Sequence, residues 1–316
     1  MSKPSEKIKI VVVGAGGLGA PVMWGLAEYF SLQSPNSDYA IELIDDDLVE
    51  LSNFNRQIFF KEHDIGKHKT KALKKGLEQC LNRNLPNIRT HNTKLQIDNI
   101  TQLLTGSNIV LDCTDNTETK FLLNDFCVLQ KIPLVHAGAS GGIGQVMAID
   151  SSKNSPCLRC LFGNFSENDY KDQTTTCRHA GIFGAFVGMV GFLQVKLAIS
   201  LLKNETETLS HGHLYRIDYP SLEERSVAVK AAKDCPLGCS TQQKTILDLA
   251  DIKCPETYLY TKLKLEQMPR ESLLDVRLSS LESISNVSKS VQEEGFSLLG
   301  DSLNLSKDLW SLRILC

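Results

Sequence analysis

Residues 9–19 read KIVVVGAGGLG, a β-branched run that leads directly into a turn with four glycines. A helical stretch follows at 20–30 and a second apolar strand at 40–44. Strand, glycine turn, helix and strand in this order predict a βαβ unit. Because the turn opens a helix, its N–H groups and the helix dipole would face a bound phosphate. The stretch therefore predicts a nucleotide-binding domain.

Strand and helix signals continue to alternate beyond this unit. We expect a Lys-rich helix at 67–82, strands near Ile88 and at 109–112, a helix at 119–130 and a strand at 133–137. Such alternation predicts an α/β fold in which a mostly parallel sheet is covered on both faces. The expected architecture is a Rossmann-like, nucleotide-binding domain.

A second alternation begins after the polar segment 240–244, which is typical of a linker. We expect two domains, at 1–240 and 245–316, the second a small two-layer α/β sandwich. Its expected elements are strands at 246–249, 273–278, 296–299 and 309–314 and helices at 255–266 and 281–294.

Composition narrows the classes of partner. A formal net charge of -3 over 316 residues gives no electrostatic attraction for nucleic acid. Residues 1–7 lack the apolar core of a secretory signal. The apolar stretch 181–202 contains Gln194, Lys196 and recurring glycines, so a buried helix of a soluble protein is favoured over a membrane span. The glycines would let this helix pack closely, as across a homodimer. We expect a cytoplasmic enzyme.

The polar segment after the second strand bears on the choice of nucleotide. Asp45 ends that strand and is placed to bind ribose hydroxyls, which would suit NAD or ATP. Residues 45–57 then read DDDLVELSNFNRQ. Attack on an α-phosphorus requires cations at the leaving pyrophosphate, and Arg56 and Lys69 supply them. Adenylation of a carboxylate is therefore favoured over hydride transfer with NAD.

Asp115 is a further acid, just past the expected strand at 109–112. Ligand contacts lie at the carboxyl ends of such strands, where a carboxylate can hold Mg²⁺. The same position suits a helix cap. Both interpretations remain open.

The cysteines fall partly into two close pairs, Cys157 with Cys160 and Cys235 with Cys239. Ten cysteines in a reducing compartment argue against a disulfide framework. Two pairs separated by a long insert can close a tetrahedral Zn²⁺ site. Free thiols are the alternative.

Two other cysteines are candidate nucleophiles. Cys177 lies among polar and cationic residues ahead of an expected helix, a setting that lowers the pKa of a thiol. Cys254 stands between Lys253 and Pro255 at an expected strand-to-helix junction, where a thiolate or persulfide is stabilised. For both, an unreactive cysteine is the alternative.

Several motifs in order resemble the ThiF/MoeB/HesA family of adenylyltransferases, which are related to ubiquitin-activating enzymes. They are GAGGLG at 14–19, D-x-D…S-N-x-x-R-Q at 45–57, DIG at 64–66 before Lys69, and DCTDN at 112–116. The resemblance implies that a carrier protein's C-terminal Gly-Gly carboxylate attacks ATP to give an acyl-adenylate. The implied ATP and Mg²⁺ contacts are Gly14, Gly16, Gly17, Gly19, Asp45, Asp47, Ser52, Asn53, Arg56, Lys69, Asp115 and Asn116.

The same resemblance bears on the cysteines. It implies a structural zinc at the two pairs, although the family's second pair is Cys-x-x-Cys and here three residues separate Cys235 from Cys239. Cys177 matches the family's loop cysteine. Residues 246–315, with LDLADIKCP at 247–255, resemble the TusA-like sulfur-carrier fold, in which Cys254 corresponds to the persulfide cysteine. The usual Cys-Pro-x-Pro form is broken at Thr257.

These resemblances lead to one hypothesis and three alternatives. The hypothesis is a two-step enzyme that adenylates a ubiquitin-like sulfur carrier and then delivers sulfur from Cys254, with a cysteine desulfurase as a possible donor. Adenylation of a peptide or another carboxylate without sulfur transfer is one alternative. A catalytically impaired partner-binding module is another, because the family's arginine-bearing segment before the glycine turn is not found. An NAD-dependent oxidoreductase is the third.

Overall fold

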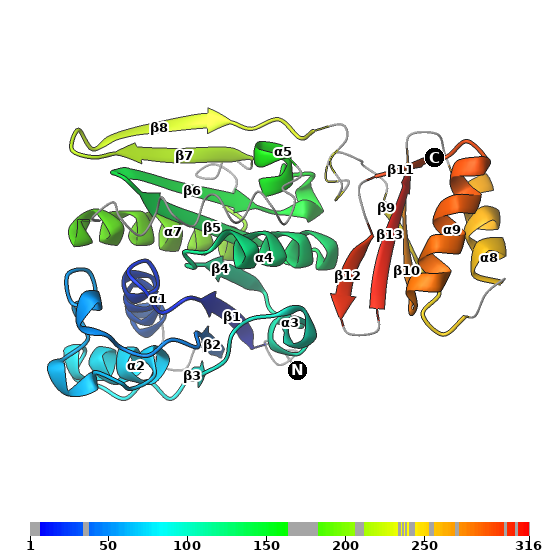
Figure 1. Cartoon of the computed structure of the whole chain (residues 1–316). Helices are drawn as coiled ribbons and strands as arrows, with labels where there is room; N and C mark the ends of the chain where they lie inside the picture. Colours follow the sequence, from blue (N-terminus) through cyan, green and yellow to red (C-terminus); the bar gives the residue numbers. More distant parts are fainter. Residues whose placement is uncertain are drawn as a thin grey trace, which may run out of the picture.

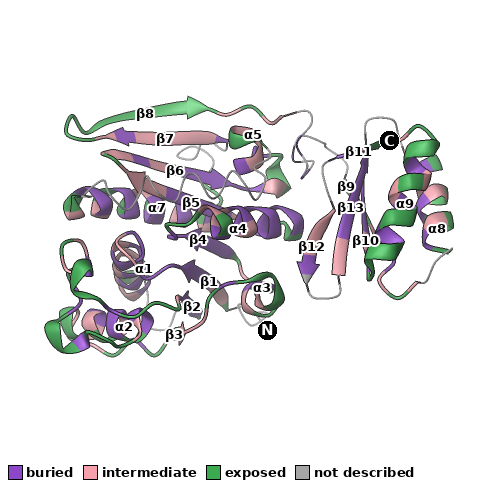
Figure 2. Cartoon of the chain, in the orientation of Figure 1, coloured by how far each residue is buried: buried purple, intermediate pink, exposed green. Residues whose placement is uncertain are grey.

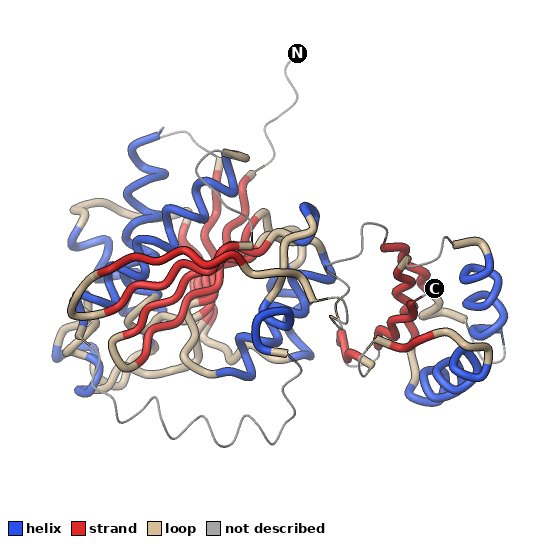
Figure 3. The backbone as a smooth tube through the Cα atoms, turned by 90° about the horizontal axis from the view of Figure 1, so that it is seen from above, coloured by secondary structure: helices blue, strands red, loops and turns tan. Residues whose placement is uncertain are grey.

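The protein consists of a large sheet domain and a small sheet domain that lie side by side (Figure 1 and Figure 3). Cys177 and Cys254 lie outside the residues whose placement is described. The computed structural model describes residues 7–33, 38–163, 183–205, 212–232, 235, 237, 239, 244–252, 256–268, 272–299, 302–306 and 309–315.

The large domain is built on an eight-stranded sheet in the order β3-β2-β1-β4-β5-β6-β7-β8. The pairs from β3 to β5 are parallel, as the alternation of strands and helices predicts. The pairs from β5 to β8 are antiparallel. The strands are β1 (Ile8–Val13), β2 (Tyr39–Ile44), β3 (Ile88–His91), β4 (Ile109–Asp112), β5 (Leu134–Ser140), β6 (Ile143–Ile149), β7 (His213–Asp218) and β8 (Glu223–Ala228).

Helices cover this sheet and connect its parallel strands. The helix α3 and the strands β6 to β8 were not among the sequence expectations; β8 is exposed along its whole length and therefore carries no apolar pattern. The α-helices are α1 (Gly19–Gln33), α2 (Lys69–Cys80), α3 (Ile97–Leu104), α4 (Thr117–Gln130), α5 (Leu158–Phe162) and α7 (Gly184–Lys203), and the 3₁₀ turns are η1 (Leu51–Asn53), η2 (Glu62–Asp64) and η3 (Ser151–Lys153).

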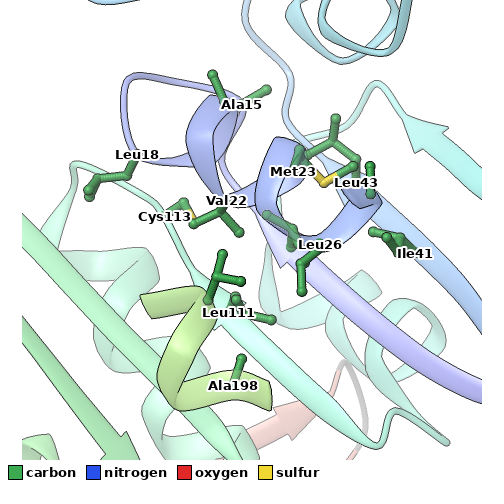
Figure 4. Close-up of a cluster of buried hydrophobic side chains, with 14 of the residues drawn as sticks. Ala15, Leu18, Val22, Met23, Leu26, Ile41, Leu43, Leu111, Cys113 and Ala198 are labelled. Atoms are coloured by element: carbon green, nitrogen blue, oxygen red, sulfur yellow. The ribbon is translucent and has the colours of Figure 1, made fainter. Parts of the chain in front are cut away.

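One face of the sheet is filled by α1 and α7. Met23 and Leu26 of α1 pack toward Leu43 of β2 and Leu111 of β4, with Ala198 of α7 beneath them (Figure 4). All five side chains are buried. Burying β-branched and leucine side chains on both faces of the parallel strands stabilises this part of the sheet.

The helix α7 is the long apolar helix expected near 181–202. Its length and composition would suffice to cross a membrane, but 56% of its apolar window is buried inside the protein. Gln194, in its middle, donates hydrogen bonds to the backbone oxygens of Asp112 at 2.9 Å and Val135 at 2.8 Å. A Cβ at Gly191 would lie 2.7 Å from Cγ of Pro21 in α1. The helix therefore packs as a core helix against the sheet and α1.

The small domain is a two-layer sandwich. Its sheet has the order β11-β13-β10-β9, with β12 paired to β13. Leucine, isoleucine and valine side chains of β10 and β13 pack against α8 and α9. Its elements are β9 (Lys244–Asp248), α8 (Glu256–Glu266), β10 (Leu273–Leu278), α9 (Leu281–Glu293), β11 (Ser297–Leu298), β12 (Leu303–Ser306) and β13 (Leu309–Leu315).

Candidate nucleotide and metal sites

The glycine turn between β1 and α1 is closed by backbone atoms. Gly14 has φ +101°, and a Cβ there would lie 2.6 Å from the oxygen of Cys113 at the end of β4. A Cβ at Gly19 would lie 1.9 Å from the oxygen of Gly14. A Cβ at Gly16, by contrast, would meet nothing closer than Nε2 of Gln57 at 3.9 Å. Gly14 and Gly19 are therefore required for the turn itself, whereas Gly16 leaves open the side on which a phosphate would bind.

Gly19→Ala is expected to destabilise the protein, because its methyl group cannot avoid the Gly14 carbonyl without opening the turn. We expect the free energy of unfolding to fall by about 2–5 kcal/mol, the range of severe steric substitutions. Gly16→Ala is the matched control and should unfold within about 1 kcal/mol of the unmodified protein. Urea denaturation measures both, and equal stabilities would contradict this account of the turn.

Asp45 lies at the end of β2 directly against this turn. Its carboxylate accepts hydrogen bonds from the backbone N–H of Ala15 at 2.7 Å and of Asp47 at 2.8 Å. Burial raises the pKa of Asp45, while the two backbone hydrogen bonds and the charge of Lys69 oppose that increase. Asp45, which the sequence predicts to bind the ribose, therefore lies beside the backbone N–H of Ala15.

Lys69 begins α2 and directs its charge to the same place. Its Nζ lies 2.6 Å from Oδ2 of Asp47, and its backbone N–H donates to the Asp47 oxygen at 2.9 Å. The Lys69 side chain is 11% exposed and that of Asp47 is 63% exposed. The mostly buried stem of Lys69 therefore holds the ammonium group in place. The side chain of Asp47, which pairs with it, is exposed enough to turn into solvent.

Arg56 packs directly on the glycine turn. A Cβ at Gly17 would lie 3.2 Å from Cδ of Arg56, so the arginine stem packs on that glycine. Its Nη1 donates to the Ser52 oxygen at 3.0 Å and to Oδ1 of Asn55 at 2.9 Å. Asn53 is buried, and its Oδ1 accepts from the Glu50 N–H at 3.0 Å. Arg56 and Lys69 are thus both brought to the glycine turn, while the Asn53 side chain shapes the loop.

The residues after β4 distinguish the two interpretations of Asp115. Asn116 is the N-cap of α4, and its Oδ1 accepts from the Thr119 N–H at 2.8 Å. Asp115 is exposed at the carboxyl end of β4. The cap is therefore supplied by Asn116, one of the expected nucleotide contacts, and the Asp115 carboxylate faces solvent at the sheet edge.

A buried charge network lies under this edge of the sheet, and no sequence motif indicates it. Asp112 accepts from Oγ1 of Thr114 at 2.7 Å and from Nζ of Lys120 at 3.1 Å, and it contacts Nδ1 of His136 at 2.7 Å. Burial raises the pKa of Asp112, but Lys120 and His136 outweigh burial and hold it well below its usual range. Burial and Lys120 lower the pKa of His136. The network ties α4 and the ends of β4 and β5 together beneath the site.

Gln57 is a second residue that the motif reasoning left unassigned. It is 1% exposed, and neither atom of its amide has a hydrogen-bond partner among the described residues. Buried amides are normally satisfied, so a water or a ligand is expected to bind this one. Its place next to Gly16 and Arg56 makes it a further candidate contact to nucleotide.

The four paired cysteines come together on the other side of the large domain. The sulfur of Cys157 lies 3.9 Å from that of Cys160 and 3.7 Å from that of Cys235. The sulfur of Cys239 lies 3.0 Å from that of Cys160 and 3.2 Å from that of Cys235. Thiolates bound tetrahedrally to zinc at about 2.3 Å are about 3.8 Å apart. The three-residue spacing of the second pair therefore allows a four-sulfur site that fits zinc.

The electrostatics of this cluster differ from one sulfur to the next. Hydrogen bonds from the Cys157, Cys235 and Cys239 thiols lower the pKa of Cys160. Burial raises the pKa of Cys157. Arg159, between them in sequence, forms a two-point contact with Asp125, with Nε–Oδ1 at 3.1 Å and Nη2–Oδ2 at 2.7 Å. The turn that carries the first pair is thereby anchored to α4.

Two family models match the chain. The ThiF family model matches residues 3–237, and the Sulfurtransferase TusA model matches residues 245–314.

Curated relatives match mainly over the large domain. Over 236 residues the chain is 34% identical to adenylyltransferase and sulfurtransferase MOCS3 of Culex quinquefasciatus, covering 74% of this chain and 50% of that protein. Over 234 residues it is 32% identical to SAMP-activating enzyme E1 of Haloferax volcanii, covering 72% and 79%. Over 238 residues it is 34% identical to sulfur carrier protein ThiS adenylyltransferase of Escherichia coli, covering 72% and 85%. The chain thus spans half the length of the first of these relatives.

Solved structures agree on the fold of the large domain. E. coli MccB with ATP superimposes with a TM-score of 0.58 at 22% sequence identity, over 72% of this chain and 66% of that one.

Proposed function

The chain belongs to the ThiF family, and on that premise we propose that it adenylates the C-terminal Gly-Gly carboxylate of a ubiquitin-like sulfur-carrier protein and then delivers sulfur to it. The observation that carries the proposal is the union, in one chain, of a glycine turn flanked by Lys69 and Arg56 with a TusA sulfurtransferase domain. The names of the relatives, which include an adenylyltransferase and sulfurtransferase, support the same pair of activities. Family membership also favours ATP over NAD as the nucleotide.

In the first step the carrier carboxylate attacks the α-phosphorus of ATP. A bond forms from the carboxylate oxygen to phosphorus, the bond to the bridging oxygen breaks, and pyrophosphate leaves. The amides of the glycine turn and the N-terminus of α1 would hold the phosphates, and Asp45 would hold the ribose. Lys69 and Arg56 would stabilise the charge that develops on pyrophosphate.

In the second step the terminal sulfur of a Cys254 persulfide attacks the acyl carbon and AMP leaves. The product is an acyl disulfide. A second thiol then attacks the Cys254 sulfur, forms a disulfide with it and releases the thiocarboxylate. Fusion of the two domains raises the local concentration of the sulfur donor near the adenylate. Cys177 is a second candidate nucleophile for this stage.

Metal ions support this chemistry in two places. Mg²⁺ would be held at the exposed Asp115 carboxylate and would neutralise charge on the triphosphate. Zn²⁺ would be held by Cys157, Cys160, Cys235 and Cys239 as a structural ion.

The proposal includes the oligomeric state of the protein and its cellular location. A homodimer would form through the outer side of α7, where Met189 is 41% exposed and Phe192 is 44% exposed. A cysteine desulfurase would load Cys254 with sulfur in the cytoplasm.

Carrier-dependent ATP–pyrophosphate exchange tests the adenylation step. With labelled pyrophosphate, Mg²⁺ and a ubiquitin-like carrier ending in Gly-Gly, label should enter ATP. A carrier that lacks its last glycine serves as the control and should give no exchange. Exchange with a short peptide but with no Gly-Gly carrier would support the alternative substrate class, and an absence of exchange with every carboxylate would overturn the proposal.

A further inference from the structure

The small sheet has one face without helices, and the part of that face formed by β10 and β13 is mostly buried. Leu274 and Val276 of β10 and Leu312 of β13 point toward α8 and α9. Because side chains alternate along a strand, Asp275 and Arg313 point to the opposite face. They are nevertheless only 2% and 3% exposed. In a two-layer domain standing alone this face would meet solvent, so something else must cover it.

The large domain provides the cover. The small sheet lies between the large domain and the helices α8 and α9, and its strands β10 and β13 are mostly buried (Figure 2). The strand β12 packs against α3. Leu303 of β12 packs against the hydrophobic cluster that contains Cys157 and Cys235. A cavity of about 130 Å³ remains between the domains, lined by Ile100 of α3, Phe126 of α4 and residues 302–305.

Arg313 brings a positive charge into this contact. Its Nε lies 3.6 Å from Oδ2 of Asp275, its neighbour in the β10–β13 register. Asp275 also accepts a hydrogen bond from Oγ of Ser311. Burial lowers the pKa of Arg313, while negative charge at Asp275 and then at Asp125 of α4 acts to raise it. Ser311 and Arg313 lie on the same face of β13, and Leu303, the partner of Ser311 in β12, packs against the hydrophobic cluster that contains Cys157 and Cys235. The guanidinium group of the small domain therefore lies on the face that meets this part of the large domain.

The four-cysteine cluster becomes negatively charged when it binds Zn²⁺, and this charge would act on Arg313. Four thiolates around one Zn²⁺ carry a formal net charge of about −2. Arg159 on the same turn is already paired with Asp125. A buried cation is costly unless an anion lies near it, and attraction across a low-dielectric contact is strong. The loaded cluster is thus a further counter-charge for Arg313, in addition to Asp275.

We propose that Arg313 couples metal occupancy of the four-cysteine site to docking of the small domain. Metal-bound sulfurs attract the guanidinium group and hold the helix-free face of the small sheet against the large domain. Removing the metal weakens that contact. By linkage, a docked small domain must in turn raise the affinity of the four-cysteine site for metal. The inference does not depend on the proposed function, because it is measured without ATP or carrier.

The unmodified full-length protein gives the first test. Small-angle X-ray scattering of the zinc-loaded protein is expected to show a compact particle. Removing zinc with a chelator should increase its radius of gyration, and returning zinc should reverse the change. Circular dichroism measured in parallel shows that the sheets remain folded. A radius of gyration that is unchanged after chelation would overturn the proposal.

Arg313→Met, which keeps the length of the side chain but removes its charge, gives the second test. Its affinity for zinc, measured by competition with a colorimetric chelator, should be about tenfold lower than that of the unmodified protein, as expected for the loss of one close charge. Arg277→Met is the matched control, because Arg277 lies on the same sheet face but faces Asp248 at 3.8 Å. Equal zinc affinities for both variants would overturn the role of Arg313, whatever the scattering shows.

Discussion

Lys69→Met is expected to lower carrier-dependent ATP–pyrophosphate exchange by about 10²- to 10³-fold, the loss typical for removal of one transition-state charge contact. The Lys69 Nζ lies beside Asp47 and within reach of Asp45 at the glycine turn, where negative charge on the leaving pyrophosphate would develop. The stem of Lys69 is mostly buried. Methionine preserves that stem without the charge.

The fold should survive this change. The partner of Lys69 is 63% exposed, and breaking a pair with a solvated carboxylate costs little stability. Lys71→Met is the matched control, since Lys71 is exposed two residues further along α2 and should exchange at the unmodified rate. If the two variants keep equal exchange rates at saturating ATP, Lys69 does not stabilise the transition state and another cation must be assigned.

The difference between the two halves of the large sheet shows what the sequence could predict. The strands β1, β2 and β4 are buried on both faces and are rich in valine, isoleucine and leucine, so their runs stand out from the helices between them. The strands β7 and β8 lie at the antiparallel edge, and β8 is exposed throughout. Without a buried face, an edge strand has no apolar period to detect.

The candidate site follows the same logic. Asp45, Arg56 and Lys69 were predicted because each stands in a motif of fixed spacing next to a strand end or helix start. Gln57 stands in one of those motifs, but only its burial beside Gly16 sets it apart from an ordinary loop residue. Arg313 carries no motif at all. Its position depends on a contact between two domains that no local pattern encodes.

Cys254→Ala is expected to abolish formation of carrier thiocarboxylate while leaving ATP–pyrophosphate exchange within about twofold of the unmodified rate, because only the sulfur step needs a nucleophilic thiol. Mass spectrometry of the carrier after incubation with ATP and a persulfide donor measures the first quantity. Cys80→Ala is the matched control, since Cys80 is an exposed thiol at the end of α2 and should yield the unmodified amount of thiocarboxylate. If the Cys254 variant still formed thiocarboxylate, Cys254 would not be the sulfur nucleophile, and Cys177 or a separate donor would have to supply it.

The arrangement of the two domains bears on how sulfur from Cys254 reaches the adenylate. The strand β1 begins on the side of the small domain and ends at the glycine turn on the opposite side (Figure 1). A docked small domain therefore lies away from the edge where the adenylate of its own subunit would form. In the proposed mechanism, sulfur carried by Cys254 must arrive either after undocking or from a neighbouring subunit. Mixing Lys69→Met with Cys254→Ala distinguishes the two routes: recovered thiocarboxylate requires transfer between subunits, and no recovery requires transfer within one.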